Sequence, residues 1–434
     1  MDRSSGRWWL VAFAALAMGA AGSYQFVWST IRGPLGAHVG AGEAALGTVF
    51  TAFVLAQTVA GFPAGRYRDR HGPRLPLAVG GVLVAAGYAG VALAPSFPAA
   101  LAAYALGGVG SGTVYTVAVN TPVKWFDARR GLATGVVTMA YSASSAPLIR
   151  YVGPTVGRDF AGTLAVLAAV TGVACLVGVP VLDDPERAAD AGGDGRTGTE
   201  TGGDGDGEAD DDPGAERGGD EREAPAAGRA SSGEYTWRET VRTWQFWTLY
   251  GAFLVVNGVG LMLIGKVVAL ATGLGLPAGA GTLAASVLAV GDGAGIVVIG
   301  AASDRLGRER TVGASLTCCG LALAGTVLLG AGSAGAFVAL AGAAAFLRSP
   351  AFAVFPSLVG EYYGAERSSE NYALLYSAKL PGGVVGGTAA SLLVAAVGWT
   401  DAFLLGAGLL VVAGLATAAL RPVQPTARTA ESAT

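Results

Sequence analysis

The sequence is poor in the residues that build catalytic and metal sites, and poor in charge. Its 434 residues include two histidines, three cysteines and three lysines, and only 14% are charged. Cys175, Cys318 and Cys319 lack the spacing of a metal or disulfide site. His38 and His71 have no companion ligands nearby in the sequence. We therefore expect no metal, no cofactor and no enzyme activity.

A nucleotide-binding run of the form Gly-x-x-x-x-Gly-Lys-Ser/Thr is also missing, so we do not expect ATP to drive the protein. What the chain does contain is apolar sequence: 52% of its residues are hydrophobic and 69 are glycine. Apolar runs recur at lengths of about 20 residues, enough to cross a bilayer as a helix. Small residues at this density suit helices that pack closely in lipid. The composition predicts a polytopic membrane protein.

The apolar runs divide into six before and six after a polar segment, so we expect an all-α membrane protein with twelve transmembrane helices. The first six are expected at Trp8–Ile31, Ala44–Ala64, Leu75–Ala94, Pro98–Val119, Leu132–Val152 and Ala161–Leu182. The second six are expected at Phe246–Thr272, Ala278–Ala302, Val312–Gly332, Ala334–Leu358, Tyr372–Val397 and Ala402–Leu420. The predicted domains are an N-terminal six-helix half (1–182), a linker (183–238) and a C-terminal half with a short tail (239–434).

Charge is distributed unevenly. The segment from Asp183 to Glu234 contains 17 acidic and 5 basic residues, which predicts a disordered, flexible tether. Most remaining Arg and Lys residues fall in the termini and in alternate loops, on one predicted side of the membrane. By the positive-inside rule both termini and the linker are expected in the cytoplasm, with the chain in the plasma membrane.

One loop motif occurs twice, 235 residues apart, in the pattern Gly-x-x-x-Asp-Arg-x-Gly. Its members are Gly65, Asp69, Arg70 and Gly72 after the second span, and Gly300, Asp304, Arg305 and Gly307 after the eighth. The glycines permit a tight turn and close helix approach. The charged pair could latch the cytoplasmic face in one conformation, and we predict a gating role. The alternative is a solvated basic loop that only fixes topology.

Lys379 is the only charged side chain of the eleventh span. A charge at that depth costs about 3 kcal/mol or more, so it usually faces a cavity, a partner or a substrate. Tyr372, Tyr376 and Lys379 are spaced to share one helical face. We predict that this face looks into a polar cavity. The alternative is that Lys379 snorkels to a lipid headgroup.

The repeated loop resembles the signature loop of the major facilitator superfamily, and the resemblance covers essentially the whole chain except the linker. Five runs are also similar to the oxalate/formate antiporter family and its monocarboxylate-transporter relatives: Gly22–Trp28, Lys124–Gly135, Gly260–Gly265, Phe355-Pro356 and Ser377–Lys379. The resemblance implies the two-half major facilitator fold, and a role for Lys379 in binding a substrate carboxylate. One departure stands out, because Ile296 replaces an Arg that those antiporters carry in the eighth span.

Arg348 is a candidate replacement for that missing Arg. Counted from the basic loops at 1.5 Å per residue, Asp292, Arg348 and Lys379 all lie about 18 Å deep, near mid-membrane. We predict a cluster of these three residues with a net charge near +1 when Asp292 is ionised. Asp292 could carry a proton. Alternatively, Asp292 and Arg348 form an internal ion pair that never touches substrate.

The resemblance places tyrosines around a small carboxylate, and phenol hydroxyls can donate hydrogen bonds to it. The predicted substrate-binding residues are Lys379, Arg348, Tyr24, Trp28, Tyr115, Tyr141, Phe352 and Tyr376. Each aromatic residue alone could equally be packing. Gln57 could bond a neighbouring helix, and Lys266, near the outer end of its span, could attract anions or snorkel.

These features predict a monomeric secondary transporter of a small organic anion, a mono- or dicarboxylate, that works by alternating access in the lipid bilayer. Proton symport and anion exchange both remain open, and no nucleic-acid partner is expected. Efflux of drugs or other hydrophobic solutes is an alternative, although it predicts an acidic cavity. A non-transporting membrane sensor is the alternative from another class.

Overall fold

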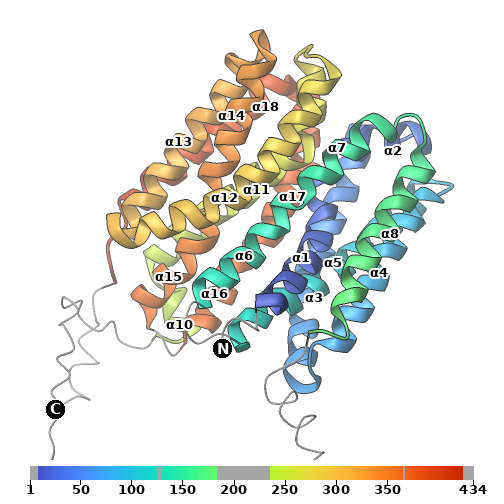
Figure 1. Cartoon of the computed structure of the whole chain (residues 1–434). Helices are drawn as coiled ribbons and strands as arrows, with labels where there is room; N and C mark the ends of the chain where they lie inside the picture. Colours follow the sequence, from blue (N-terminus) through green and yellow to red (C-terminus); the bar gives the residue numbers. More distant parts are fainter. Residues whose placement is uncertain (1–7, 126–129, 183–234, 365–366, 424–434) are drawn as a thin grey trace, which may run out of the picture.

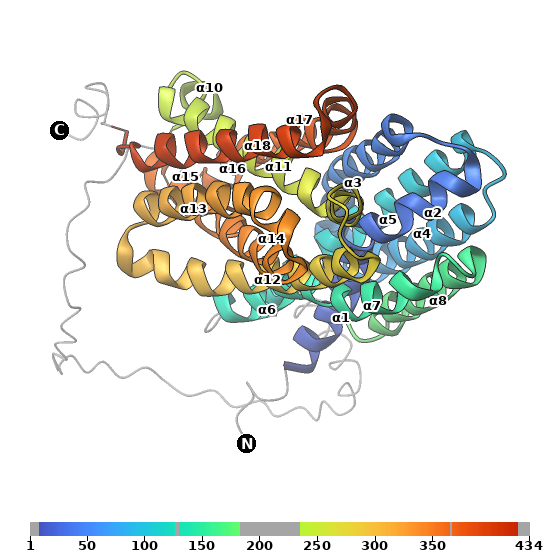
Figure 2. The same cartoon turned by 90° about the horizontal axis from the view of Figure 1, so that it is seen from above.

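The computed structural model describes residues 8–125, 130–182, 235–364 and 367–423. Every regular element in these ranges is a helix, and Figures 1 and 2 show the helices gathered into two bundles that lie side by side. One bundle comes from the N-terminal half of the chain and the other from the C-terminal half.

In the N-terminal half, the described residues form eight helical segments. They are α1 (Trp8–Phe26), α2 (Trp28–Val39), α3 (Glu43–His71), α4 (Arg74–Ala92), α5 (Phe97–Trp125), α6 (Arg130–Ala143), α7 (Ser145–Thr155) and α8 (Phe160–Gly178). The run expected as one span from Trp8 to Ile31 is therefore two helices that meet at Val27.

The helices of the C-terminal half are divided into more segments in the described ranges. Its elements are α10 (Trp237–Thr240), α11 (Trp244–Gly273), α12 (Ala278–Leu306), α13 (Arg308–Leu328), η2 (Gly330–Gly332), α14 (Ala334–Arg348), α15 (Ala351–Tyr363), α16 (Ser368–Tyr376), α17 (Lys379–Val384), η3 (Val385–Ala389) and α18 (Ala390–Ala418).

Eleven segments in the described ranges are long and apolar enough to cross a membrane. The last, Asn371–Ala418, has 48 residues, and Gly398 interrupts it with a φ of 84°. A helix of that length would extend about 70 Å, more than twice the hydrocarbon thickness, so this segment accounts for two spans. The all-helical, twelve-span fold class is confirmed.

The end of the predicted linker needs correction. The backbone N–H of Tyr235 donates to the carbonyl of Tyr363 at 2.9 Å, and the Asn371 amide donates to the carbonyl of Tyr235 at 3.0 Å. Residues 235–238 therefore pack against the C-terminal half instead of belonging to a tether. Residues 183–234 lie outside the described ranges, so the tether itself stays a prediction.

In the C-terminal half, two spans that we expected to be continuous helices are interrupted, in each case near a proline. Pro350 cannot donate to the carbonyl of Phe346, and the Ser349 hydroxyl bonds that carbonyl at 3.3 Å instead. Pro381 likewise leaves the carbonyl of Ser377 without its usual partner, and the N–H of Leu380 bonds it at 3.0 Å. The first interruption follows α14 and the second separates α16 from α17.

The two repeated loops take the same place in each half, between α3 and α4 and between α12 and α13. Gly72 and Gly307 end their helices with φ values of 86° and 89°, which a residue with a Cβ rarely adopts. The expected tight turns are therefore present. We refer to the end of the bundle with these loops, where α1 also begins, as the basic end (Figure 1).

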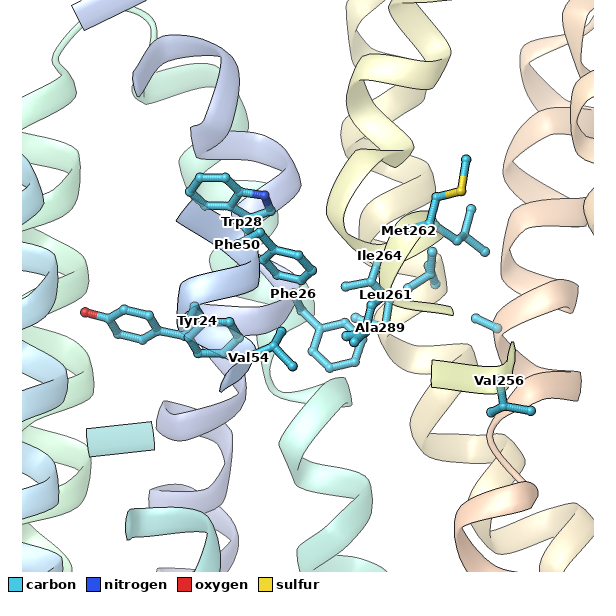
Figure 3. Packing of buried hydrophobic residues seen from close by; sticks show 14 of the residues in the cluster. Tyr24, Phe26, Trp28, Phe50, Val54, Val256, Leu261, Met262, Ile264 and Ala289 are labelled. Atoms are coloured by element: carbon cyan, nitrogen blue, oxygen red, sulfur yellow. The ribbon is translucent and has the colours of Figure 1, made fainter. Parts of the chain in front are cut away.

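Apolar side chains join the two halves away from the basic end. In Figure 3, Phe26 and Phe50 of the N-terminal half face Leu261 and Ile264 of α11. All four side chains are at most 3% exposed. A Cβ on Gly265 would lie 3.2 Å from the Phe50 ring, so the helices approach closely here.

Candidate functional site

Lys379 is the first residue of α17, where the eleventh span is interrupted, and it is only 9% exposed. Its Nζ donates to Oε1 of Gln57 at 3.1 Å and to the hydroxyl of Tyr376 at 3.3 Å. It also lies 5.6 Å from the centroid of the Tyr376 ring. Within the described ranges Lys379 forms no ion pair. A buried cation is thus held by neutral groups alone.

Gln57 extends this contact into the N-terminal half. Its Nε2 donates to the hydroxyl of Tyr141 at 2.6 Å and to that of Ser111 at 3.0 Å. The Tyr141 hydroxyl donates in turn to Oε1 of Gln25 at 3.1 Å. Polar groups therefore connect Lys379 with α3, α5, α6 and α1, so both halves contribute to the site.

Arg348 and Asp292 form an ion pair inside the C-terminal half. The two residues are 4% and 5% exposed, and they come from the end of α14 and the middle of α12. Ser142 of α6 lies against the neighbouring Gly293, so the pair sits beside the other half. The predicted three-residue cluster is thus divided: Arg348 pairs with Asp292, and Lys379 contacts Gln57 and Tyr376.

Aromatic rings fill the space between the two cations. The Arg348 guanidinium lies 5.3 Å from the centroid of Phe352. Phe253 contacts both Phe352, at 5.3 Å between centroids, and Tyr376, at 5.9 Å. On the N-terminal side the Tyr115 ring meets Tyr141 edge-on at 5.3 Å. The structure therefore brings four of the predicted aromatic residues together around the Lys379 region: Tyr115, Tyr141, Phe352 and Tyr376.

Tyr24 and Trp28, which were also predicted to bind substrate, do not lie with the four aromatic residues around Lys379. Tyr24 is fully buried, its hydroxyl donates to the carbonyl of Val84 at 2.8 Å, and its ring packs 4.1 Å from Tyr88. Trp28 is 1% exposed and lies 4.7 Å from Tyr104. Tyr24 is embedded in the packing of the N-terminal half, and Trp28 packs between that half and Gly265 of α11, so both rings have the packing role that the sequence left open. We leave both out of the site.

The repeated loop of the C-terminal half makes ion pairs within that half. Asp304 lies 3.6 Å from Arg308, and Nε of Arg308 lies 2.8 Å from Glu361. Gly65 and Gly300 allow close approach, because an added Cβ would lie 3.3 Å from Thr116 and 3.2 Å from Ala353 respectively. Arg70 and Arg305 are exposed, and the Asp69 side chain is outside what the structure describes. Their role as a latch stays a prediction.

Gly260 of α11 makes room for Arg348, and this gives a testable consequence. A Cβ at this position would overlap the Arg348 side chain. We expect Gly260→Ala to push Arg348 away from Asp292 and to destabilise the protein by about 1–3 kcal/mol, the usual cost of overpacking. Thermal unfolding of the purified protein in detergent measures this. Gly251→Ala, on the same helix with no atom within 4 Å of the new Cβ, is the control. Equal effects of both changes would contradict this account.

A buried polar site between two helical bundles is the arrangement found in secondary transporters. The sequence profile of the Major Facilitator Superfamily matches residues 8–276 and 255–434. The chain belongs to that superfamily.

Relatives and solved structures agree with this assignment. The oxalate:formate antiporter of Oxalobacter formigenes is 28% identical over 400 residues, which cover 92% of this chain and 88% of the antiporter. An uncharacterized 38 kDa protein of Thermoproteus tenax is 30% identical, covering 94% of each chain. A D-xylose-proton symporter has the same fold, with a TM-score of 0.69 at 14% identity over 95% of this chain and 97% of that one.

Proposed function

We propose that this transporter moves a small organic anion, a mono- or dicarboxylate, by alternating access. The observation that carries the proposal is Lys379, a buried cation with neutral partners at the junction of the two halves. A carboxylate bonded to Lys379 would compensate its charge, and charge-assisted hydrogen bonds are the strong ones. The name of the Oxalobacter formigenes relative supports this class of substrate.

Charge favours a substrate with one carboxylate at this site. Arg348 and Asp292 compensate each other, so the charges of Arg348, Asp292 and Lys379 sum to +1. One carboxylate would neutralise that charge. A dicarboxylate would also have to draw Arg348 away from Asp292, which would leave a buried acid without its partner.

The contact between Lys379 and Gln57 indicates how binding could be linked to movement. Lys379 belongs to the C-terminal half and Gln57 to the N-terminal half. A carboxylate that takes the place of the Gln57 oxygen would receive hydrogen bonds from both halves, from Lys379 and from donors such as the Tyr141 hydroxyl and the Gln57 amide. The halves would then rock around the substrate while it stays at mid-membrane.

The same charge count favours anion exchange over proton symport. An empty carrier would have to reorient with an uncompensated buried cation, which is costly, whereas a loaded carrier would be neutral at this site. Proton symport would require Asp292 to separate from Arg348 and take up a proton. Because of this additional requirement, proton symport is the second candidate mechanism.

Orientation follows from the charge distribution. The start of α1 and the two repeated loops lie at the basic end. The positive-inside rule assigns this end to the cytoplasm. We therefore propose a plasma-membrane protein with cytoplasmic termini, whose opposite end is extracellular.

Uptake into proteoliposomes tests the proposed function. A panel of labelled mono- and dicarboxylates is offered to vesicles that are empty, or loaded with the same unlabelled anion. We expect saturable monocarboxylate uptake that internal anion accelerates at least about tenfold, since the loaded carrier returns without a buried charge. A pH gradient alone should have little effect. Absence of carboxylate uptake, with transport of hydrophobic cations instead, would contradict the proposal and favour drug efflux.

A further inference from the structure

A second buried charge cluster joins the halves at the end opposite the basic loops. Nη2 of Arg32 lies 2.5 Å from Oε1 of Glu43, and Nζ of Lys266 lies 3.0 Å from the same oxygen. Lys266 also donates to the hydroxyl of Ser391 at 2.5 Å. That hydroxyl in turn lies 3.5 Å from the same oxygen of Glu43. We call Arg32, Glu43, Lys266 and Ser391 the Glu43 cluster.

The Glu43 cluster contains one acid and two bases, so it holds a net charge of +1 when ionised. The side chains of Arg32 and Lys266 are each 3% exposed, whereas that of Glu43 is 31% exposed. Nε and Nη1 of Arg32 are buried and have no hydrogen-bond acceptor among the described residues. A carboxylate at the mouth of the cluster therefore covers two buried cations, and unused donors lie behind it.

The members of the cluster come from different halves. Arg32 and Glu43 belong to α2 and α3, whereas Lys266 and Ser391 belong to α11 and α18. If this end of the bundle opens, the N-terminal half would carry Glu43 and Arg32, as a neutral pair, away from Lys266 and Ser391. Lys266 and Ser391 would remain in the C-terminal half, as a cation and a hydroxyl turned toward the opening. A lysine cation and a hydroxyl at the opening are groups that bind a carboxylate through charge-assisted hydrogen bonds.

Lys266 and Ser391 donate hydrogen bonds to one oxygen of Glu43, and Arg32 lies beside the same oxygen, so these groups are arranged around a carboxylate. We propose that Lys266 and Ser391 form an outer binding site for the carboxylate of an incoming substrate, and that Glu43 occupies this site while the end is closed. The inference rests on the proposed function. A substrate carboxylate displaces Glu43, which breaks the contact between the halves and opens the path to Lys379.

The outer site is separate from the Lys379 site. Glu43 and Gln57 are fourteen residues apart on α3, or about 21 Å along the helix. A small carboxylate cannot span this distance, so it would bind the two sites in sequence. Glu43 competes with the substrate at the outer site only.

The first readout is the opening of this end. Thr51 is 7% exposed, and its hydroxyl bonds that of Thr388 across the halves at 3.0 Å. In a background with Cys175→Ala, Cys318→Ser and Cys319→Ala, Thr51→Cys is labelled from outside with a membrane-impermeant maleimide. External substrate should accelerate labelling. Glu43→Gln and Lys266→Gln should each accelerate it about tenfold without substrate, since each removes a charge-assisted contact between the halves.

The second readout separates a binding site from a simple gate. Glu43→Gln removes the competitor and keeps Lys266, so the KM for external carboxylate should fall about fivefold. Lys266→Gln removes the binding cation, so that KM should rise about tenfold. Ser391→Ala keeps all charges and should raise it about twofold, which provides a mild variant in case the others fold poorly.

The outcomes distinguish the two proposals. If the wild type transports carboxylate and both glutamine variants shift KM in the same direction, or Ser391→Ala leaves KM unchanged, the outer site is wrong and the proposed function stands. If Thr51→Cys is labelled at the same rate with and without substrate, and at the same rate in both glutamine variants, the Glu43 cluster is not a gate. The inference is then overturned. If the wild type transports no carboxylate, both proposals fail.

Discussion

Lys379→Gln is expected to weaken carboxylate transport about a hundredfold in kcat/KM. The variant keeps hydrogen-bonding capacity near Gln57 and Tyr376 and removes only the charge. Hydrogen bonds to charged groups contribute about 1.5–3 kcal/mol, which corresponds to ten- to hundredfold in affinity. Uptake into proteoliposomes, measured over a range of substrate concentrations, gives both the KM and the maximal rate.

Two further variants control for a purely structural role of Lys379. Lys379→Arg keeps the charge and should retain part of the uptake. Gln57→Glu places a carboxylate where Gln57 Oε1 now accepts from Lys379 at 3.1 Å, so it should mimic a bound substrate and inhibit uptake. If Lys379→Gln transports like the wild type, or Gln57→Glu leaves the KM unchanged, Lys379 does not bind the substrate.

Asp292→Asn is expected to destabilise the protein by about 3–5 kcal/mol, because it leaves the buried Arg348 without its counterion. The double variant Asp292→Asn/Arg348→Gln should recover most of this loss, since neither charge then remains buried. Thermal unfolding of purified protein in detergent, read by intrinsic fluorescence, compares the variants. Asp304→Asn, at a side chain 66% exposed, should change stability by at most about 0.5 kcal/mol.

The double variant also bears on coupling. If the Asp292–Arg348 pair is structural, the double variant should still exchange carboxylates, with the same response to a pH gradient as the wild type. A double variant that folds but has lost a proton dependence seen in the wild type would instead make Asp292 the proton carrier. If the Asp292→Asn single variant is as stable as the wild type, Asp292 is not needed to compensate the charge of Arg348.

The sequence predicted the features that depend on local pattern. Apolar length identified the spans, and the repeated glycines predicted the turns that Gly72 and Gly307 make at positive φ. Counting residues from the basic loops predicted a mid-membrane position for Lys379, and the structure shows that this side chain is buried within the protein. The Asp292–Arg348 pair was one of two alternatives, and the structure contains it.

Features that depend on which helices meet could not be read from the sequence. Gln57 lies 322 residues from Lys379, and no local pattern indicates their contact. Tyr24 and Trp28 were predicted to bind substrate, but the sequence could not show that these side chains pack against α4 and α5. The helix interruptions did have a signal, because Pro350 and Pro381 each remove a backbone donor within a predicted span.

Equilibrium binding to purified protein tests the central claim most directly, since it needs no transport. Isothermal titration in detergent compares a monocarboxylate with a neutral analogue of equal size on three proteins: wild type, Lys379→Gln and Asp292→Asn/Arg348→Gln. We predict that the wild type and the double variant bind the monocarboxylate, that neither binds the neutral analogue, and that Lys379→Gln binds about a hundredfold more weakly. Equal monocarboxylate binding by Lys379→Gln and wild type would contradict the account.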